Sequence, residues 1–545
     1  MFTEPVVGKA FFGREDILSI LEKRVNALTK GFRQNVALTG QMLAGKSSIL
    51  HQFLSDLKKS TLIPIYLEVV EEPFTSFANK FIATLLHNYM GSLGGTFPNN
   101  DLIGLIKTAK SQIPRTASAI KRITNDLLKK DYTLAYQKLL NLTSILKEET
   151  GKSCVVILDE FHNMEHFKIK KPYLYFGKIM MVQKDTMYIV SSSQRNTIKK
   201  ILSEKLALLY GNFEIIEVSG FDDKTARAFL HEKFQNITAR PPYINFITAF
   251  TDNNPFYIDV ISKKIIEIAN SQKLGSLSES LIIEAFTALL HSTNGTINQY
   301  FTNNIMELLD KNLRKDYLDL LIALSCGSNK LTDIAAWFGK KNTSGFTAKL
   351  DRLIALDMIY KNGVFYELQD RVFKFWLKTV YYKKKVSLVD DILRRTDDFK
   401  NEVSEELSGY LTESHLNVAE RVKELFSLFD GETVEIEKKQ RRLPKFVKIE
   451  LQKYRTHYSL ITKQKTNKYW ICEIWENRIG DFEISNFIKN SRIAKEKKSK
   501  KVCITLNGID ANALLLAKEK NVWVWDLKKV NTLLRIYKKH DLQAI

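Results

Sequence analysis

Five short apolar runs, separated by stretches with helical periodicity, constrain the fold of this chain more than any other feature. The runs are residues 35–39, 62–67, 154–158, 187–192 and 213–218. A β-strand that is buried on both faces reads as a continuous apolar run, so this alternation predicts a parallel sheet covered by helices. We therefore expect an α/β fold in which the long segment 74–150, between the second and third strands, is entirely helical.

The rest of the chain changes its pattern several times, and 545 residues are too many for a single hydrophobic core. Helix follows helix from Asp222. Three amphipathic helices and two strand-like runs around Lys361-Asn362-Gly363 come next, which is the pattern of a winged helix-turn-helix. We predict a sheet domain at 1–220, a helical lid at 221–310, a winged helix at 311–385, a helical connector at 386–417 and a second α/β domain at 418–545.

The composition is that of a packed globular protein, with 44% hydrophobic and 11% aromatic residues. No apolar stretch approaches the roughly 18 residues of a membrane span, and residues 1–5 lack the features of a secretory signal. The four cysteines are scattered and form no CxxC pair. A reducing, cytoplasmic compartment without a membrane partner is therefore expected.

The positive charge of the chain is large and uneven. The formal net charge is +21, and residues 431–545 carry 26 Lys and Arg against 13 Asp and Glu, a net charge of +13. Such asymmetry favours an anionic partner, with nucleic acid first and an acidic protein or a membrane surface second. The alternative is a solvated lysine surface that only keeps the protein soluble.

A glycine-rich segment follows the first predicted strand and precedes a predicted helix. It matches GxxxxGK[ST] and reads Gly40-Gln41-Met42-Leu43-Ala44-Gly45-Lys46-Ser47, with Ser48 next in the helix. Glycines let such a loop curl so that backbone N–H groups face phosphates, beside the positive end of a helix. In this pattern Lys46 reaches the β- and γ-phosphates and Ser47 binds Mg²⁺. Residues 40–48 are thus predicted to be the phosphate-binding loop (P-loop) of an NTPase, with ATP and Mg²⁺ as ligands.

Two acidic residues end the third predicted strand. Asp159 follows the apolar residues 155–158, and Glu160 is its neighbour. The end of a parallel strand delivers a carboxylate beside the phosphates, where Asp159 can hold Mg²⁺. Glu160 suits a base that orients the attacking water. The alternative is a pair of plain surface acids at a strand end.

The fourth predicted strand ends in polar residues. Ser191, Ser192, Ser193, Gln194 and Arg195 follow one another there, at the edge of the sheet where the P-loop and Asp159 are expected. We expect one of them to sense the γ-phosphate. The sequence does not decide which one, and Arg195 is the candidate that could contribute a positive charge to catalysis.

Four further segments resemble the archaeal ATPase family, whose members are P-loop proteins of the AAA+ and STAND kinds. They are Phe12-Gly13-Arg14-Glu15, Leu209-Tyr210-Gly211, Asn254-Pro255-Phe256-Tyr257 and the stretch 366–376 that ends in Phe375-Trp376. The resemblance covers most of residues 8–380. It implies ATP binding, magnesium dependence, slow hydrolysis and a nucleotide-driven conformational switch. It also implies that Arg14 contacts the base side of the nucleotide and that Pro255 provides a contact from the lid.

The chain departs from the family pattern at two positions. Asn212 stands where the family has an arginine after Tyr-Gly, and Asn253 stands where a glycine is usual. A positive charge expected near the phosphates is therefore missing, for which Arg195 could substitute. Hydrolysis of ATP is consequently less firmly predicted than its binding.

The winged helix offers basic side chains to an anionic partner. The third helix of this motif commonly enters the major groove while its hairpin contacts phosphate. Here Lys340, Lys341, Lys349, Arg352 and Lys361 could meet phosphate. Winged helices in multidomain ATPases also serve as protein-packing modules, so the motif by itself leaves DNA contact open.

Segment 418–545 resembles the restriction-endonuclease-like, PD-(D/E)xK fold in its order of elements, with Glu420 on the opening helix. That chemistry needs an acid on one strand and an acid-x-lysine on the next. Glu473 fits, but Trp475 occupies the lysine position and the preceding strand has no Asp. We expect no cleavage. Tyr454, Tyr458, Trp470 and Trp475 would suit a nucleic-acid surface or simply fill the core.

Together these features predict a cytoplasmic ATPase that acts as a nucleotide-driven switch on nucleic acid, DNA in particular, within a homo-oligomer. Two alternatives stay open. The chain could be a STAND signalling scaffold whose C-terminal domain binds a protein, or an ATP-regulated DNA nuclease.

Overall fold

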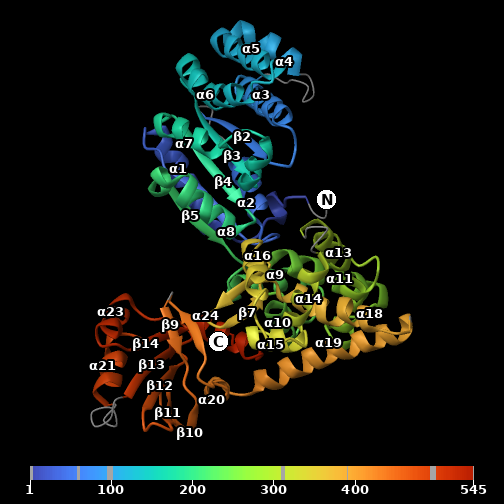
Figure 1. The fold of residues 1–545 in the computed structure, drawn as a ribbon, viewed down its shortest axis with the longest axis vertical. Coiled ribbons are helices and arrows are strands. Elements are labelled where there is room, and N and C mark those ends of the chain that lie inside the picture. Colours follow the sequence, from blue (N-terminus) through green and yellow to red (C-terminus); the bar gives the residue numbers. More distant parts are fainter. Residues whose placement is uncertain are drawn as a thin grey trace. The chain divides into compact units, whose positions relative to one another are not determined.

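A computed structural model describes residues 4–57, 62–94, 102–308, 314–389, 391–437, 439–490 and 499–543 (Figure 1). Its contacts divide the chain into two compact units. The first extends to Gly220 and includes residues 355–357, and the second contains the remainder from Phe221 to the C-terminus. No described helix is both long and apolar enough to cross a membrane.

The first unit is built on a five-stranded sheet. Its strands are β1 (Asn35–Gly40), β2 (Leu62–Glu68), β3 (Ser153–Asp159), β4 (Thr186–Ser192) and β5 (Phe213–Val218). They lie in the order β2-β3-β4-β1-β5, and every pairing is parallel. All five predicted strands are therefore confirmed, as is the parallel α/β sheet of a P-loop NTPase.

Helices cover both faces of this sheet. Every residue of β3 is buried, and its side chains alternate between two cores. Val155 and Ile157 pack with α1 (Glu15–Thr29) and α2 (Lys46–Asp56), whereas Val156 and Leu158 face the opposite core with the other helices. Two-sided burial explains why this strand reads as a continuous apolar run.

The segment between β2 and β3 consists, where it is described, of helices joined by short connections and contains no strand, in agreement with the prediction. Its helices are α3 (Phe74–Gly91), α4 (Leu102–Gln112), α5 (Pro114–Leu128) and α6 (Tyr132–Thr150). Pro114 occupies the first turn of α5, where a missing N–H costs nothing, and the Asp131 side chain caps α6 by accepting from Leu134 N. Two more helices, α7 (Pro172–Val182) and α8 (Arg195–Lys200), flank β4 in the sequence.

The second unit begins with a helical region and a three-helix motif. The helical region comprises α9 (Asp223–Lys233), α10 (Pro241–Phe250), α11 (Pro255–Gln272), α12 (Glu279–Phe286) and α13 (Thr296–Leu308). Next come α14 (Arg314–Ser325), α15 (Leu331–Trp337), α16 (Phe346–Ala355) and a hairpin of β6 (Ile359–Asn362) and β7 (Phe365–Leu368). Three helices and a hairpin are the elements predicted for the winged helix.

A helical stretch leads to the C-terminal sheet. It consists of α17 (Arg371–Trp376), α18 (Lys383–Val386), α19 (Ile392–His415) and α20 (Val418–Ser427). The sheet contains β10 (Phe446–Lys453), β11 (Tyr458–Gln464), β12 (Tyr469–Trp475), β13 (Ser499–Thr505) and β14 (Trp523–Asp526) in sequence order. Its first two pairings are antiparallel and its last two parallel. These five strands agree with the predicted α/β domain.

Helices also cover both faces of the C-terminal sheet. Trp470, Cys472 and Ile474 of β12 pack in a core with α20 and α24 (Leu527–Ile536). Ile471 and Trp475 face the other way, into a smaller core with α21 (Asp481–Asn490) and α23 (Ala511–Glu519). An additional hairpin of β8 (Thr433–Ile436) and β9 (Lys439–Arg442) was not predicted.

The β6–β7 hairpin is docked on β8 within the second unit. Val364 N donates to Thr433 O at 3.0 Å, and the Asn362 amide exchanges hydrogen bonds with the backbone of Glu435. Gly363 has φ +61°, and a Cβ there would lie 1.9 Å from Thr433 O. Only glycine fits this turn, which therefore holds the hairpin against the C-terminal region.

A buried ion-pair cluster joins the lid helices to the C-terminal helix of the same unit. Asp541 accepts from Arg371 at 2.7 Å and from Arg535 at 2.6 Å, and Arg535 also pairs with Asp252 after α10. Burial alone would raise the pKa of Asp541, but the two guanidinium groups hold it below its ordinary value. Removing one partner would leave a buried charge unpaired, so the cluster ties these elements together.

Candidate functional site

The P-loop runs from the end of β1 to the start of α2, as predicted. Gly45 caps α2 with φ +93°, and Leu43 has φ +64°. The curl therefore falls at residues 43–45. Gly40 serves a different purpose, because its φ is ordinary but an added Cβ would lie 2.1 Å from Val218 O of the neighbouring β5. Close approach of two strands requires the first glycine, and left-handed backbone requires the second.

Lys46 is the first residue of α2, and its side chain turns back over the loop. The residue is buried, and Nζ donates to Gly40 O at 3.1 Å and to Gln41 O at 2.9 Å. Burial lowers the pKa of Lys46, while the carboxylates of Glu160 and Asp159 act in the opposite direction. A cation held this way sits inside the loop, where it can meet phosphate.

Asp159 lies at the end of β3 and meets the P-loop directly. Ser47 Oγ donates to Asp159 Oδ2 at 2.7 Å. The other partners of this buried carboxylate are Tyr66 Oη at 2.9 Å, Glu160 N at 3.0 Å and the Ser191 hydroxyl. The loop and the strand-end acid, 112 residues apart in the sequence, therefore converge on one point.

Ser47 and Asp159 fit a divalent cation. Mg²⁺ prefers oxygen ligands and is usually held by one or two protein oxygens together with phosphate and water. A hydroxyl and a carboxylate provide that donor set, and they already lie within hydrogen-bond distance of each other. These two residues would hold the metal.

Glu160 is turned toward the polar end of β4. Its Oε2 accepts from Ser193 N at 2.9 Å and from Ser193 Oγ at 2.8 Å, and His162 Nδ1 lies 3.3 Å away. Glu160 itself has φ +50° in the left-handed region, which costs a non-glycine residue free energy. Burial raises the pKa of its carboxyl, and the positive charge of Lys46 opposes this shift.

His162 is buried beside Glu160 and stays neutral. Burial lowers the pKa of His162 to about 4. Its Nδ1 lies 2.9 Å from Ser192 Oγ. The ring therefore adds a polar contact next to the glutamate without adding a positive charge.

Arg14 contacts the P-loop from the start of α1. Its guanidinium donates to Ala44 O at 3.3 Å and to the carbonyls of Ser219 and Gly220 after β5. Arg14 has φ +70°. The structure thus brings this residue to the P-loop, while its predicted contact with the base side of a nucleotide stays a prediction.

Arg195 begins α8 and pairs with β5. NH1 lies 3.4 Å from Glu217 Oε1. The charge of Arg195 also lowers the pKa of Lys46, which indicates that the two cations are close. The side chain is 19% exposed, and its role in catalysis stays a prediction.

The remaining predicted residues are placed as follows. Met42 is 47% exposed on the P-loop, and Ser48 Oγ accepts from Val6 N of the N-terminal segment. Pro255 is in the second unit, where it is the first residue of α11, and its lid contact stays a prediction. The side chains of Leu209 and Tyr210 lie outside the described residues.

Tyr66 and His162 were not predicted from the sequence. Tyr66 reaches Asp159 from β2, and burial together with this carboxylate raises the pKa of its hydroxyl. The sequence feature that could have indicated this contact is a ring with a hydroxyl group two residues before the end of an apolar strand. His162 follows Glu160 by two positions, and only the turn of residues 161–167 shows that it folds back.

Three of the five basic residues predicted to meet phosphate in the three-helix motif have intramolecular partners. Lys349 Nζ lies 2.5 Å from Asp316 Oδ2, Lys340 lies over the Phe346 ring, and Lys361 lies over the ring of Tyr366. With its hairpin docked on β8, this motif packs against its own unit. Contact of these lysines with DNA stays a prediction.

Glu473 lies on β12 opposite Ser459 of β11 and opposite Cys503 of β13. Trp475, in the position of a nuclease lysine, is 9% exposed and part of the core. Within the described ranges no group of three or more His, Cys, Asp and Glu is placed to hold a metal ion. These strands do not fit a metal-dependent nuclease centre.

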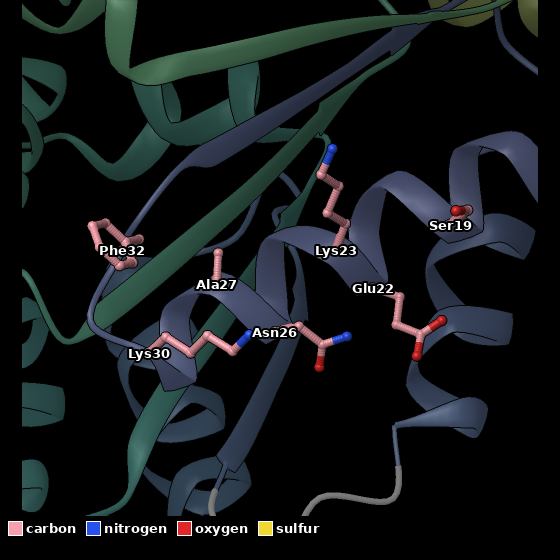
Figure 2. Close-up of a pocket in the computed structure, with 7 residues that line it drawn as sticks. All are labelled: Ser19, Glu22, Lys23, Asn26, Ala27, Lys30 and Phe32. Atoms are coloured by element: carbon pink, nitrogen blue, oxygen red, sulfur yellow. The ribbon is translucent and has the colours of Figure 1, made fainter.

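A shallow hollow lies on the outer side of α1, away from the P-loop residues (Figure 2). It has a volume of about 500 Å³ and is lined by Ser19, Glu22, Lys23, Asn26, Ala27, Lys30 and Phe32. Figure 2 shows Ser19, Glu22, Lys23, Asn26 and Ala27 on α1, with Lys30 directly after the helix and Phe32 on the connection to β1. No residue of the predicted nucleotide site lines it.

Comparison with known proteins agrees with this geometry. Residues 11–261 match the family described as "ATPase domain predominantly from Archaea". Similar solved structures include the Walker-type ATPase PABY2304 of Pyrococcus abyssi, with 16% identity, TM-score 0.48 and coverage of 69% of this chain and 99% of that one. Another is the ORC2 protein of Aeropyrum pernix in its ADPNP–ADP complexes, with 13% identity, TM-score 0.41 and coverage of 75% and 98%. No curated protein matches the sequence. Residues 11–261 belong to the archaeal ATPase family.

Proposed function

We propose that the chain is an ATP-hydrolysing switch that acts on nucleic acid. The observation that carries the proposal is the 2.7 Å hydrogen bond between Ser47 and Asp159, which joins the P-loop to the strand-end acid. Around this point Lys46 provides the positive charge for the phosphates, and the two oxygens provide Mg²⁺ ligands. Bound Mg²⁺ would neutralise the charge that develops on the transferred phosphoryl group.

The state of Glu160 supports slow turnover. A base that orients water must reach the water, but Oε2 of this glutamate is held by two hydrogen bonds from Ser193. Its left-handed backbone and its raised pKa are further features of a residue under constraint. Hydrolysis then requires that ATP draw Glu160 away from Ser193.

The organisation of the second unit supports the coupling to a partner. The lid helices, the three-helix motif and the basic C-terminal region form one compact unit, and Asp541 with its arginines joins the first part to the last. Nucleotide-driven movement of the lid would therefore carry the C-terminal region with it.

Nucleic acid is the partner that the charge favours. Residues 441–468 contain nine Lys and Arg and one acidic residue, Glu450. They include β10 and β11, which form the end of the sheet distant from β14 in strand order. A basic surface of this kind neutralises phosphates. By this proposal DNA is the partner, the lysines of the three-helix motif are secondary contacts, and the protein acts in the cytoplasm as a homo-oligomer.

One observation favours the alternative of a STAND scaffold with a protein partner. Four large apolar side chains around the start of α19 are strongly exposed, with Leu388 at 101%, Val389 at 71%, Ile392 at 65% and Leu393 at 79%. Exposed apolar groups that lie together often mark a protein interaction site.

Binding of a labelled DNA duplex at several salt concentrations, with and without ATP, tests the proposal. We expect log affinity to fall linearly with log salt, with a slope near about −0.9 for each neutralised phosphate. ATP should change the affinity of the wild type but not that of Lys46→Ala, which should lose at least about 30-fold in ATP affinity by calorimetry. Lys23→Ala, an exposed lysine on α1, is the control. Absent or salt-independent DNA binding would favour the scaffold.

A further inference from the structure

A cavity of about 520 Å³ opens on the C-terminal sheet between the β10–β12 strands and α21. This volume is within the range of about 300–1,000 Å³ that is typical of small-ligand sites. Its lining includes Tyr454, His457, Ser459, Glu473, Trp475 and Phe482. Aromatic rings, hydroxyls and a carboxyl group therefore meet in one hollow.

The strand pairing explains why the cavity forms there. Ser459 pairs with Glu473 and Ile461 pairs with Ile471, so these side chains point to the same face of the sheet. On that face α21 and α23 pack against Ile471, Trp475 and the residues of β13 and β14 (Figure 1). The helices cover one side of the face, and the cavity lies where β10 and β11 continue beyond them.

Three aromatic rings form a stack along the wall of the cavity. The His457 ring lies 4.3 Å from that of Trp475, at 19°, and 4.9 Å from that of Tyr454, at 7°. Burial lowers the pKa of His457, so the ring is neutral and contributes a flat surface. Tyr454, at the outer end of the stack, is 50% exposed, and Phe482 on α21 is 73% exposed. Rings that are left this open are available to stack with a planar ligand.

Glu473 forms the polar part of the lining. Its side chain is 12% exposed, and Oε2 is buried with no hydrogen-bond partner among the described residues. Oε1 lies 3.7 Å from His457 Nε2. Burial raises the pKa of the Glu473 carboxyl to about 7. A buried polar atom without a partner is unusual and costs stability, which a bound ligand can offset.

Charged side chains also occur at the cavity. Arg478, which pairs with Asp510, and Glu483 line it. Lys463 lies further along β11, on the same face of the strand as Ser459. A ligand that joins a planar ring to an anionic backbone would meet both the aromatic groups and the positive charge of Arg478 and Lys463.

We propose that the cavity binds a base of a single-stranded nucleic acid, which stacks on Tyr454 and Phe482 and directs its polar edge to the Glu473 carboxyl. The backbone phosphates would then lie near Arg478 and Lys463. A neutral carboxyl has one donor and one acceptor, which every nucleobase can match, so the site tolerates different sequences. A base inside a duplex is stacked and paired, so the ligand is a single strand.

This inference rests on the proposed action on nucleic acid and goes further, because it names the strand and the residues. The test uses the full-length protein and a labelled 12-nucleotide single strand, with binding followed by anisotropy. A second strand of the same length carries abasic sites and keeps only the backbone. A third contains 2-aminopurine, whose fluorescence falls when the base stacks.

Base stacking predicts that Tyr454→Ala and Phe482→Ala each weaken binding of the normal strand by about 5- to 100-fold. Both variants should also abolish the quenching of 2-aminopurine. The wild type should bind the abasic strand as weakly as the variants bind the normal one. Phe32→Ala is the matched control, because Phe32 is a ring with 74% exposure in the other unit. Tyr454 and Phe482 are 50% and 73% exposed, so neither substitution is expected to prevent folding.

The outcomes separate the two proposals. Salt-dependent binding that is equal for the normal and abasic strands, and unchanged in both variants, would overturn the base-binding cavity and leave the proposed function intact. If neither single strands nor duplex bind, both proposals fail.

Discussion

Each unit of the molecule holds a partly buried glutamate near the end of a sheet strand, and the two glutamates differ in their partners. Burial raises the pKa of both carboxyls. Glu160 nevertheless has two hydrogen bonds from Ser193 and a histidine nearby. Glu473 lies near one histidine and has a hydrogen bond with the Trp475 side chain, while its Oε2 has no hydrogen-bond partner within the described residues.

The difference indicates what each site is prepared to do. A glutamate whose hydrogen bonds are satisfied by the protein is held in a defined position and must be released before it can act on a ligand. A carboxyl oxygen that has no partner in the protein, such as Glu473 Oε2, gains one only when a ligand enters. Glu160 therefore suits a step that is switched on by ATP, and Glu473 suits binding alone.

The largest expected effect is on ATP hydrolysis and comes from replacing Glu160, the glutamate that we propose to act in catalysis. Glu160→Gln keeps the shape and the hydrogen bonds from Ser193 but cannot accept a proton from water. We expect ATP hydrolysis to fall by about 10²- to 10⁴-fold while ATP affinity, measured by calorimetry, stays within a few-fold of the wild type. The control is Glu214→Gln on β5 of the same sheet, which alters a partly exposed ion pair with Arg24 of α1. Unchanged turnover in Glu160→Gln would remove Glu160 from the mechanism.

The next effect concerns stability. Below its ordinary pKa of 4.5 Glu473 is protonated in both the folded and unfolded chains, so burial has no electrostatic cost. Between pH 4.5 and about 7 Glu473 ionises more readily in the unfolded chain than in the folded one. The free energy of unfolding of the wild type therefore falls by up to about 3 kcal/mol over this range, and the fall is complete above pH 7. Neighbouring Lys501 and Trp475 oppose the shift. The glutamine of Glu473→Gln does not titrate. The Tm of this variant, relative to that of the wild type, should therefore be higher at pH 8 than at pH 5.

Thermal unfolding at both pH values measures this gain. Glu519→Gln, a side chain that is 67% exposed beside Lys520, should follow the wild type at each pH. A difference in Tm between Glu473→Gln and the wild type that is equal at pH 5 and pH 8 would show that Glu473 is not an uncompensated buried acid.

The nucleotide site could be predicted because its information is local. The P-loop is eight consecutive residues, and Asp159 ends an apolar strand that the pattern alone identifies. Parallel strands then bring their ends together whatever their order. Tyr66 could not be predicted, because its contact with Asp159 depends on β2 lying beside β3. The purpose of Gly40 depends likewise on β5 being its neighbour.

The C-terminal cavity could not be predicted for the same reason. His457, Trp475 and Phe482 come from a turn, a strand and a helix, and no spacing in the sequence marks their convergence. Glu473 was singled out only by a resemblance to nucleases, which gave no hint of an aromatic stack. The β8–β9 hairpin was missed because Lys439-Gln440-Arg441-Arg442 has no apolar alternation, and among the described strands β9 pairs with β8 alone.

The smallest effect tests how Glu160 is held. Ser193→Ala removes the hydroxyl that donates to Oε2 and keeps the backbone N–H. A lost hydrogen bond to the charged form disfavours that form by about 1 kcal/mol, which raises the pKa of Glu160 further. The acidic limb of the pH profile of kcat/KM, which reports the pKa of Glu160 in the free enzyme, should therefore move to higher pH by somewhat less than about one unit. Ser193→Thr keeps a hydroxyl and should restore the profile, whereas a limb that stays in place in Ser193→Ala would show that the N–H alone positions Glu160.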